Sequence, residues 1–292
     1  MDETATEAGK PKRRPPRDRF RPKAEAGMRI EARDAEILTA LFWHRLMSRG
    51  QIERAFFSST VRCNARLRAL FDHGFVARQY PPYAPFGAQA IYSATKAALP
   101  AVARHLGKDL CEIAPFFNSK TPAFIEHTLS VADIWLHFRE ALAARTGVEL
   151  DLWLGELGCR DEWDISAPGS KWRTEVFKPD AFARLFDATN DTYHSFFLES
   201  DLGHTSAKQF AGKLATHARY LESGLFEQTF GTPSFRTLVV TTGEKRLKNL
   251  QELAAQSGNA LFWFSTFDRL QNASILGPVW NAPQASSLSL LL

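Results

Sequence analysis

The sequence has few cysteines and no long apolar run. Its 292 residues include three cysteines, Cys63, Cys111 and Cys159, and no CxxC pair. This pattern argues against a zinc finger and a disulfide framework, and it predicts the reducing cytoplasm as the compartment. The chain lacks a run of about 18 apolar residues and an N-terminal apolar signal region, so neither a membrane span nor a secretory signal is predicted. It also lacks a P-loop, a Rossmann glycine fingerprint and a Ser–His–Asp nucleophile motif.

The charge balance is only mildly basic. Lys and Arg number 36 against 32 Asp and Glu, which gives a formal net charge of +4. Much of the excess lies in residues 1–28, where KPKRRPPRDRFRPK combines basic residues with prolines and few core-forming side chains. We expect a disordered basic tail that adds affinity for DNA or RNA by releasing condensed counterions.

Residues 29–106 predict three helices followed by a hairpin. RDAEILTALFWHRLMS has apolar residues at helical spacing, and Ser48 is a candidate N-cap for a short second helix, SRGQIERAFF. The third predicted helix is SSTVRCNARLRALFDHG, whose apolar stripe would include Val61 and Leu67. Two short strands, FVARQY and AIYSAT, then flank the Pro- and Gly-containing loop PPYAPFGAQ.

This order of elements resembles a winged helix-turn-helix. The resemblance implies that the third helix enters the major groove of double-stranded DNA and that the hairpin touches the backbone. Arginine can bind a guanine edge and asparagine an adenine edge, so Arg62, Asn64, Arg66 and Arg68 are the candidate base readers. Arg78 is a candidate phosphate contact near the wing. The alternative is a charged, solvated helix face on a small protein-interaction domain.

Residues 107–123 contain two prolines without clear periodicity and predict a linker, and residues 124–292 predict the second domain. There a long helix precedes the strand VELDLWLGEL, and EWDISAPGSKWR predicts a loop that can include the end of a strand. RTEVFKPDAFARLF reads as one strand interrupted at Pro179-Asp180, and YHSFFLESD as the next strand. A helix, a strand, a helix and a last strand at ALFWFSTF follow. The pattern predicts a mixed α/β fold with its sheet between helices.

Carboxylates mark the end of one predicted strand, FFLESDLGHTS. Glu199 and Asp201 stand two residues apart and therefore share a face of that strand. Antiparallel pairing with the preceding strand would bring Asp180 close to both. Three clustered carboxylates suit Mg²⁺, so Asp180, Glu199 and Asp201 are candidate metal ligands. In the alternative interpretation, Asp201 accepts backbone N–H bonds at the start of the following helix.

The acids and the order of elements around them resemble the PD-(D/E)xK nuclease superfamily, with its restriction-endonuclease-like αβββαβ domain. The resemblance implies that Asp180 and Glu199 bind Mg²⁺ and that a lysine two residues after the glutamate activates water. Asp201 stands at that lysine position, which is a departure from the pattern. Lys213 or Lys208, on the following helix, could supply the amine, and Lys213 shares a stripe with apolar residues. The candidate catalytic set is therefore Asp180, Glu199, Asp201 and Lys213.

From about Arg33 to its end, the chain also resembles the replication-relaxation family of plasmids and other mobile elements. The resemblance rests on RDAEILTALFWHRLMSRGQIERAFF, RLRALFDHGFVARQY and KPDAFARL, and on the pattern formed by Glu199, Asp201, Gly203, Thr205, Lys213 and Tyr220. It implies DNA binding in plasmid replication, relaxation or mobilisation.

Three functional hypotheses follow from these patterns. The first is a DNA-binding accessory protein of a mobile element without strong catalysis, which the missing motif lysine favours. The second is a Mg²⁺-dependent endonuclease or nickase, which the acids favour. The third is a winged-helix transcriptional regulator. Candidate partners are double-stranded DNA, other replication or mobilisation proteins and a second copy of the chain.

Overall fold

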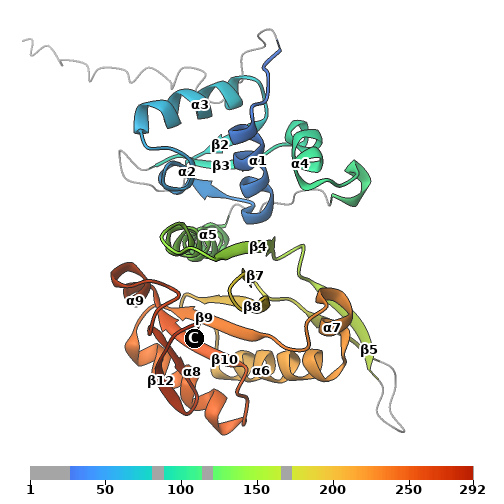
Figure 1. The fold of residues 1–292 in the computed structure, drawn as a ribbon, viewed down its shortest axis with the longest axis vertical. Coiled ribbons are helices and arrows are strands. Elements are labelled where there is room, and N and C mark those ends of the chain that lie inside the picture. Colours follow the sequence, from blue (N-terminus) through green and yellow to red (C-terminus); the bar gives the residue numbers. More distant parts are fainter. Residues whose placement is uncertain (1–26, 81–88, 114–120, 166–172, 292) are drawn as a thin grey trace, which may run out of the picture.

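The computed structural model describes residues 27–80, 89–113, 121–165 and 173–291. A helical unit with a small sheet lies on one side of helix α5, and a larger sheet lies on its other side (Figure 1). Within these ranges, helices and strands mix in both units, as predicted for the fold class. None of the helices in the described ranges is long and apolar enough to cross a membrane.

The first unit contains the predicted order of three helices and a hairpin. Its elements are α1 (Ala32–His44), β1 (Met47–Ser48), α2 (Arg49–Phe56), α3 (Thr60–Asp72), β2 (Val76–Gln79), β3 (Ile91–Ala94), a 3-10 turn (Lys96–Ala98) and α4 (Leu99–Leu106). Ser48 caps α2, because its Oγ accepts a hydrogen bond of 3.2 Å from the Gln51 N–H. The sequence did not predict β1, which pairs with β3 over only two residues, too few for a period-two signal. The loop at 81–88 lies outside the described residues.

One residue of α3 departs from its predicted place. Val61, expected in the buried stripe, is 77% exposed, whereas Cys63, Leu67 and Leu70 form the inner face of the helix. Cys63 behaves here as a small apolar residue and takes the position that the pattern assigned to valine.

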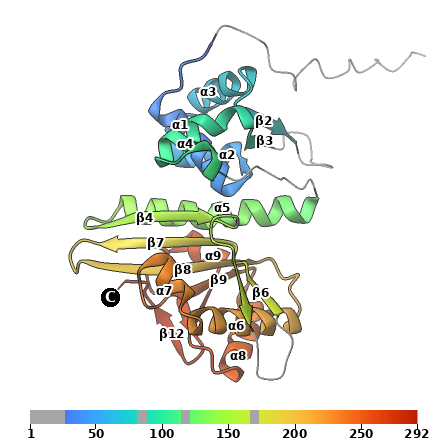
Figure 2. The ribbon, with the colours of Figure 1, turned by 90° about the vertical axis from the view of Figure 1, so that its right-hand side faces the viewer.

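Helix α5 (Pro122–Ala143) connects the two units (Figure 2). It follows a second 3-10 turn (Leu110–Glu112) within the predicted linker and begins where Thr121 Oγ1 accepts a hydrogen bond from the Phe124 N–H. Pro122 suits the first turn because that turn needs no intrahelical N–H donor. On one side, Gln51 of α2 donates to the Leu129 carbonyl and to the Asp133 carboxylate of α5, each at 2.8 Å. On the other side, Phe138 packs against Phe196 of the large sheet.

The second unit is built on a seven-stranded sheet in the order β12-β11-β10-β9-β8-β7-β4. Its strands are β4 (Val148–Gly155), β7 (Ala181–Asp187), β8 (Thr192–Asp201), β9 (Arg236–Thr241), β10 (Phe262–Thr266), β11 (Trp280–Ala282) and β12 (Ala285–Leu288). Its helices are α6 (Ala207–Glu222), α7 (Leu225–Phe230), α8 (Glu244–Gln256) and α9 (Phe267–Asn272). Strands β8, β9 and β10 are mutually parallel and the other pairings are antiparallel.

Helices cover both faces of this sheet. Leu238 and Val240 face the cluster that contains α5, whereas Val239 between them packs with Phe210 of α6 and Leu247 of α8. This alternation is the period-two pattern of a strand buried on both sides. The predicted placement of the sheet between helices is therefore confirmed.

Two local predictions in this unit are wrong, and a third is incomplete. The segment around Pro179 is not one interrupted strand, because β6 (Arg173–Phe177) pairs with β5 (Asp161–Ile165) in a separate two-stranded sheet. Asp161–Ile165 is therefore a full strand, where the sequence predicted a loop that included at most a strand end. The strand β10 is not the last, since the short hairpin β11–β12 follows it. Short strands of mixed composition carry too weak a periodic signal to be recognised from the sequence.

A close approach joins the end of α1 to the end of β4. A side chain at Gly155 would place its Cβ 1.9 Å from the Trp43 carbonyl oxygen, so only glycine fits. Beside it, Arg45 Nη1 donates to Glu156 Oε2 at 3.1 Å. Glu156 also contacts Lys178 at 2.6 Å, two residues before Asp180. The first unit is thus anchored close to Asp180, which directly precedes β7.

Candidate functional site

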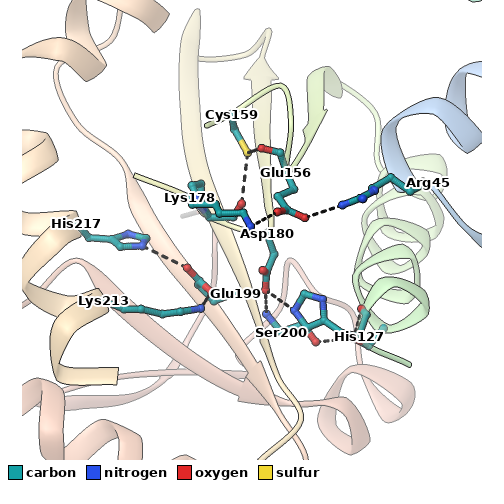
Figure 3. Close-up of polar contacts among 12 residues, drawn as sticks. Arg45, His127, Glu156, Cys159, Lys178, Asp180, Glu199, Ser200, Lys213 and His217 are labelled. Atoms are coloured by element: carbon teal, nitrogen blue, oxygen red, sulfur yellow. Dashed lines mark hydrogen bonds and ion pairs between the residues drawn. The ribbon is translucent and has the colours of Figure 1, made fainter. Parts of the chain in front are cut away.

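The structure brings Asp180 and Glu199 to one end of neighbouring strands (Figure 3). Asp180 directly precedes β7, and its backbone N–H donates to the Leu198 carbonyl of β8 at 3.0 Å. Glu199 is only 3% exposed. The antiparallel pairing of β7 with β8 is the one expected from the sequence.

Glu199 is held by two basic side chains of α6. Lys213 Nζ donates to Glu199 Oε2, and His217 Nε2 lies 3.3 Å from Glu199 Oε1. The other ring nitrogen of His217 lies 2.8 Å from Thr237 Oγ1, so a neutral ring satisfies both contacts by donating to the carboxylate and accepting from the hydroxyl. Lys213 therefore comes from the helix position that the sequence suggested, while Lys208 is exposed.

The pKa shifts reflect these pairings. Burial by itself raises the pKa of Glu199, but Lys213 and His217 offset this effect and the net pKa is lowered. Burial opposes protonation of Lys213, yet the carboxylates of Glu199, Asp180 and Asp201 raise its pKa. Burial lowers the pKa of His217 despite the neighbouring Glu199. The pair is thus an ammonium and a carboxylate at neutral pH, beside a neutral imidazole.

Asp180 has its own partners on the other side of the sheet. Its Oδ2 accepts a hydrogen bond from the Ser200 N–H at 2.8 Å and lies 3.0 Å from His127 Nε2 of α5. A hydrogen bond of 2.6 Å joins the hydroxyl groups of Ser200 and Ser130, and it holds α5 against the same strand end. Burial lowers the pKa of His127, but the hydrogen bond and charge of Asp180 more than offset this, and the pKa is raised.

Asp201 shares a face with Glu199 but has different partners. Arg246 of α8 donates to both of its carboxylate oxygens, at 2.7 and 3.2 Å, and Thr241 Oγ1 donates at 3.1 Å. Arg246 also donates to the Thr205 carbonyl, so this pair ties the turn after β8 to α8. The cap of α6 is Ser206, which accepts a hydrogen bond from the Gln209 N–H. Asp201 thus connects β8 to α8, a role that neither sequence interpretation included.

Three contributors to this region were missed in the sequence. His127 and Arg246 lie far along the chain from the acids and belong to no local motif. His217 does show a signal, because it shares the helical stripe of Phe210 and Leu214. Within the described ranges, no group of three or more His, Cys, Asp and Glu side chains is arranged to hold a metal ion.

The candidate DNA-contacting residues of α3 fall into two groups. Arg62 and Asn64 are exposed and make no side-chain hydrogen bond or ion pair with other residues that the structure describes. Arg68 is exposed and pairs with Asp72 one turn later, at 2.6 Å. The outward group therefore offers an arginine and an asparagine whose polar atoms bind no other residue in the described ranges.

Arg66 and Arg78 have partners inside the first unit. Arg66 Nε donates to Oδ1 of the buried Asp34 at 2.6 Å, and Arg66 Nη2 donates to the other oxygen of that carboxylate. Asp34 also accepts a hydrogen bond from the Glu31 N–H at the start of α1. Arg78 stacks over the ring of Phe71, 4.5 Å from its centroid. These contacts indicate structural roles for both side chains.

Comparison with known proteins places the chain within a family. The fold is a mixed α and β one, in which a helical unit with a small sheet is joined to a seven-stranded sheet. The model of the family described as replication-relaxation matches residues 38–233, which is more than half of the chain. The protein belongs to the replication-relaxation family, whose name points to a role in replication or relaxation. No curated protein and no solved structure matches it.

Proposed function

We propose that residues 29–106 form a winged helix-turn-helix that binds double-stranded DNA. We propose further that the protein is a DNA-binding accessory factor in the replication, relaxation or mobilisation of plasmids or other mobile elements. The observation that carries the proposal is the outward face of α3, where Arg62 and Asn64 are exposed and unpaired among the described residues. Membership of the replication-relaxation family supports the same role.

The chemistry of this face suits a base-reading helix. Arginine and asparagine provide two-point hydrogen bonding to guanine and adenine edges. Val61 is 77% exposed beside them and can contact a thymine methyl group. The inner face of α3 is fully buried at Cys63 and Leu67, so the helix is held firmly by its own unit. Arg66 is left out of the proposed contact set, since it neutralises Asp34.

The carboxylates support an accessory role rather than strong catalysis. Glu199 already faces Lys213 and His217, Asp180 faces His127, and Asp201 faces Arg246. Each acid is thus compensated within the protein. A divalent ion would have to compete with these partners, which reduces its gain on binding.

The DNA-binding proposal is tested with Arg62→Ala. Binding of double-stranded DNA should weaken by about 1–3 kcal/mol, with relaxed sequence preference if Arg62 reads a base. The matched control is Arg145→Ala, which removes the same charge from an exposed position just after α5. We would measure affinity for random and selected duplexes at several salt concentrations. Equal affinity and equal salt dependence for wild type, Arg62→Ala and Asn64→Ala would refute the assignment of α3.

A second candidate function is Mg²⁺-dependent cleavage of DNA. The observation that favours it is Lys213, which reaches Glu199 from α6 while Asp180 lies at the same strand end. Asp180 and Glu199 offer the oxygen ligands that Mg²⁺ prefers, and the bound ion would activate water and stabilise phosphate charge. Lys213 would then lie beside the attacking water, once its pairing with Glu199 opens.

Nicking of supercoiled plasmid by purified protein separates the two candidates. The accessory role predicts no Mg²⁺-dependent nicking above that of the Asp180→Ala variant. Robust nicking that requires Mg²⁺, and that both Asp180→Ala and Lys213→Met abolish, would establish the endonuclease. Duplex binding by the same samples shows whether each variant is folded and active in recognition.

A further inference from the structure

A hollow lies on the surface of the first unit, between the start of α1, the end of α2 and one flank of α3. It has a volume of about 330 Å³, and its lining includes Glu31, Arg33, Asp34, Phe57, Arg62 and Arg66. Figures 1 and 2 show α3 on the side of the first unit that faces away from α5. The hollow thus borders the helix that we propose to contact DNA.

Both acids of the hollow lie against one guanidinium group. Asp34 is 1% exposed, and its two carboxylate oxygens accept hydrogen bonds from Nε and Nη2 of Arg66, the first at 2.6 Å. The carboxylate of Glu31 lies 3.7 Å from the same Nη2. Three arginines line the hollow against these two acids, so the lining carries a net positive charge. This excess of positive charge suits an anion.

Arg33 and Arg62 have N–H groups available for such an anion. Both residues are exposed, and neither side chain makes a hydrogen bond or ion pair with another residue in the described ranges. Arg33 lies over the ring of Phe57, with 5.2 Å between its Cζ and the ring centroid. A guanidinium above an aromatic face keeps the N–H donors of its own plane for another partner. The hollow therefore offers two sets of donors to a ligand with several acceptor oxygens.

The geometry of α3 separates Arg62 from the other candidate base readers. An α-helix turns about 100° per residue, so Arg62 and Arg66, four residues apart, lie on one side of α3. That side faces α1, because Arg66 binds Asp34. Asn64 and Arg68 are also four residues apart, and they lie on the other flank, roughly 160° away. In a helix that enters the major groove, a side chain turned toward the flanking helix meets the DNA backbone rather than the base edges.

The N-terminal chain favours a polyanion over an isolated small anion at this place. The Arg29 carbonyl accepts a hydrogen bond of 3.5 Å from Arg66 Nη2, so the chain reaches α1 beside the hollow. The basic stretch KPKRRPPRDRFRPK precedes this point in the sequence. Its charges and those of Arg33 and Arg62 can be used together only by a ligand that carries many phosphates, such as DNA.

We propose that Arg33 and Arg62 hold one phosphate of the DNA backbone in this hollow, and thereby position α3 so that Asn64 and Arg68 face the base edges. Arginine forks match the oxygens of a phosphate, and such contacts fix the register of a protein on the duplex without reading sequence. The proposal rests on the duplex binding proposed above for α3. It adds Arg33 of α1 to the contact set and assigns Arg62 to positioning rather than reading.

The test measures binding of the full chain to a selected and a random duplex at several salt concentrations. Arg33→Ala and Arg62→Ala should each weaken binding of both duplexes by the same factor, about fivefold, and make the slope of log affinity against log salt shallower by about 1. Asn64→Ala should weaken binding of the selected duplex more than that of the random one. The control is Arg104→Ala, at an exposed position of α4 in the same unit, which should leave the affinity unchanged. Thermal unfolding checks that each variant folds.

Duplexes that carry one neutral methylphosphonate identify the phosphate itself. Wild type should lose about fivefold in affinity when the held phosphate is neutralised, whereas Arg33→Ala and Arg62→Ala should lose nothing further at that one position. Unchanged duplex affinity in Arg33→Ala overturns the proposal and leaves the role of α3 standing. A loss in Arg62→Ala that is confined to the selected duplex also overturns it, because Arg62 then reads a base. If wild type binds no duplex, the proposed function itself is refuted, and this inference with it.

Discussion

Two buried polar clusters of this protein differ in whether their atoms are satisfied. Around Glu199, the carboxylate faces Lys213 and His217, and both nitrogens of His217 have partners. Around His44, both ring nitrogens are unpaired among the described residues. Burial lowers the pKa of both histidines. The difference shows that burial alone does not define a polar site, since the atoms of one cluster are all paired and those of the other are not.

The largest effect is expected when the complete cluster is broken. Glu199→Ala leaves the buried His217 without its acceptor and Lys213 without its counter-charge, so the free energy of unfolding should fall by about 3 kcal/mol. Urea denaturation in the absence of divalent ions measures it. Glu252→Ala, at an exposed position of α8, is the control and should stay within about 0.5 kcal/mol of wild type. An unchanged or increased stability of Glu199→Ala would show instead that carboxylate repulsion dominates, as expected for a metal site lacking its ion.

The buried His44 should make the free energy of unfolding depend on pH. The folded-state pKa of His44 is about 3, below its ordinary value of 6.5, so the unfolded chain binds the proton first as pH falls. Stability is therefore fully present above pH 6.5 and is lost progressively toward pH 3. The slope approaches about 1.4 kcal/mol per pH unit, or about 2 kcal/mol between pH 6.5 and pH 5.

Comparison with His44→Phe isolates this contribution. The variant should lose less stability than wild type over the same range, while His217, whose folded pKa is also lowered, contributes equally to both. Glu36, Arg139 and Asp151 line one pocket together with His44 and are unchanged in the variant. Parallel stability curves for the two proteins would show that His44 gains a partner in solution and is not buried as a bare ring.

The smallest effect is expected at the surface, where charge pairs are solvated. Arg68 and Asp72 form an ion pair one helical turn apart, and the Arg68 side chain is 45% exposed. Arg68→Ala should leave the free energy of unfolding almost unchanged, because water and salt screen an exposed ion pair. Affinity for duplex DNA should nevertheless fall, because Arg68 lies on the proposed binding face. A large loss of stability would place Arg68 with the buried pairs instead.

Much of the fold was readable from local signals. Ser48 caps a helix where the sequence suggested, and the order of three helices and a hairpin is present. What was missed depends on distant partners. The two residues of β1 form a strand only because β3 lies alongside, and β6 pairs with β5 rather than continuing into β7. Short strands have no stable conformation of their own, so they can be assigned only when their neighbours in the sheet are known.

The sequence by itself determined that Glu199 and Asp201 face the same way, since alternate residues of a strand point to one side. Only the tertiary structure decided that Glu199 meets Lys213 whereas Asp201 meets Arg246, on a helix reached through another strand. It also brought His127 to Asp180, and it placed Trp153 of β4 beside His44 of α1. Backbone geometry sets the direction of a side chain over a few residues. The identity of its partner depends on how whole helices and strands pack.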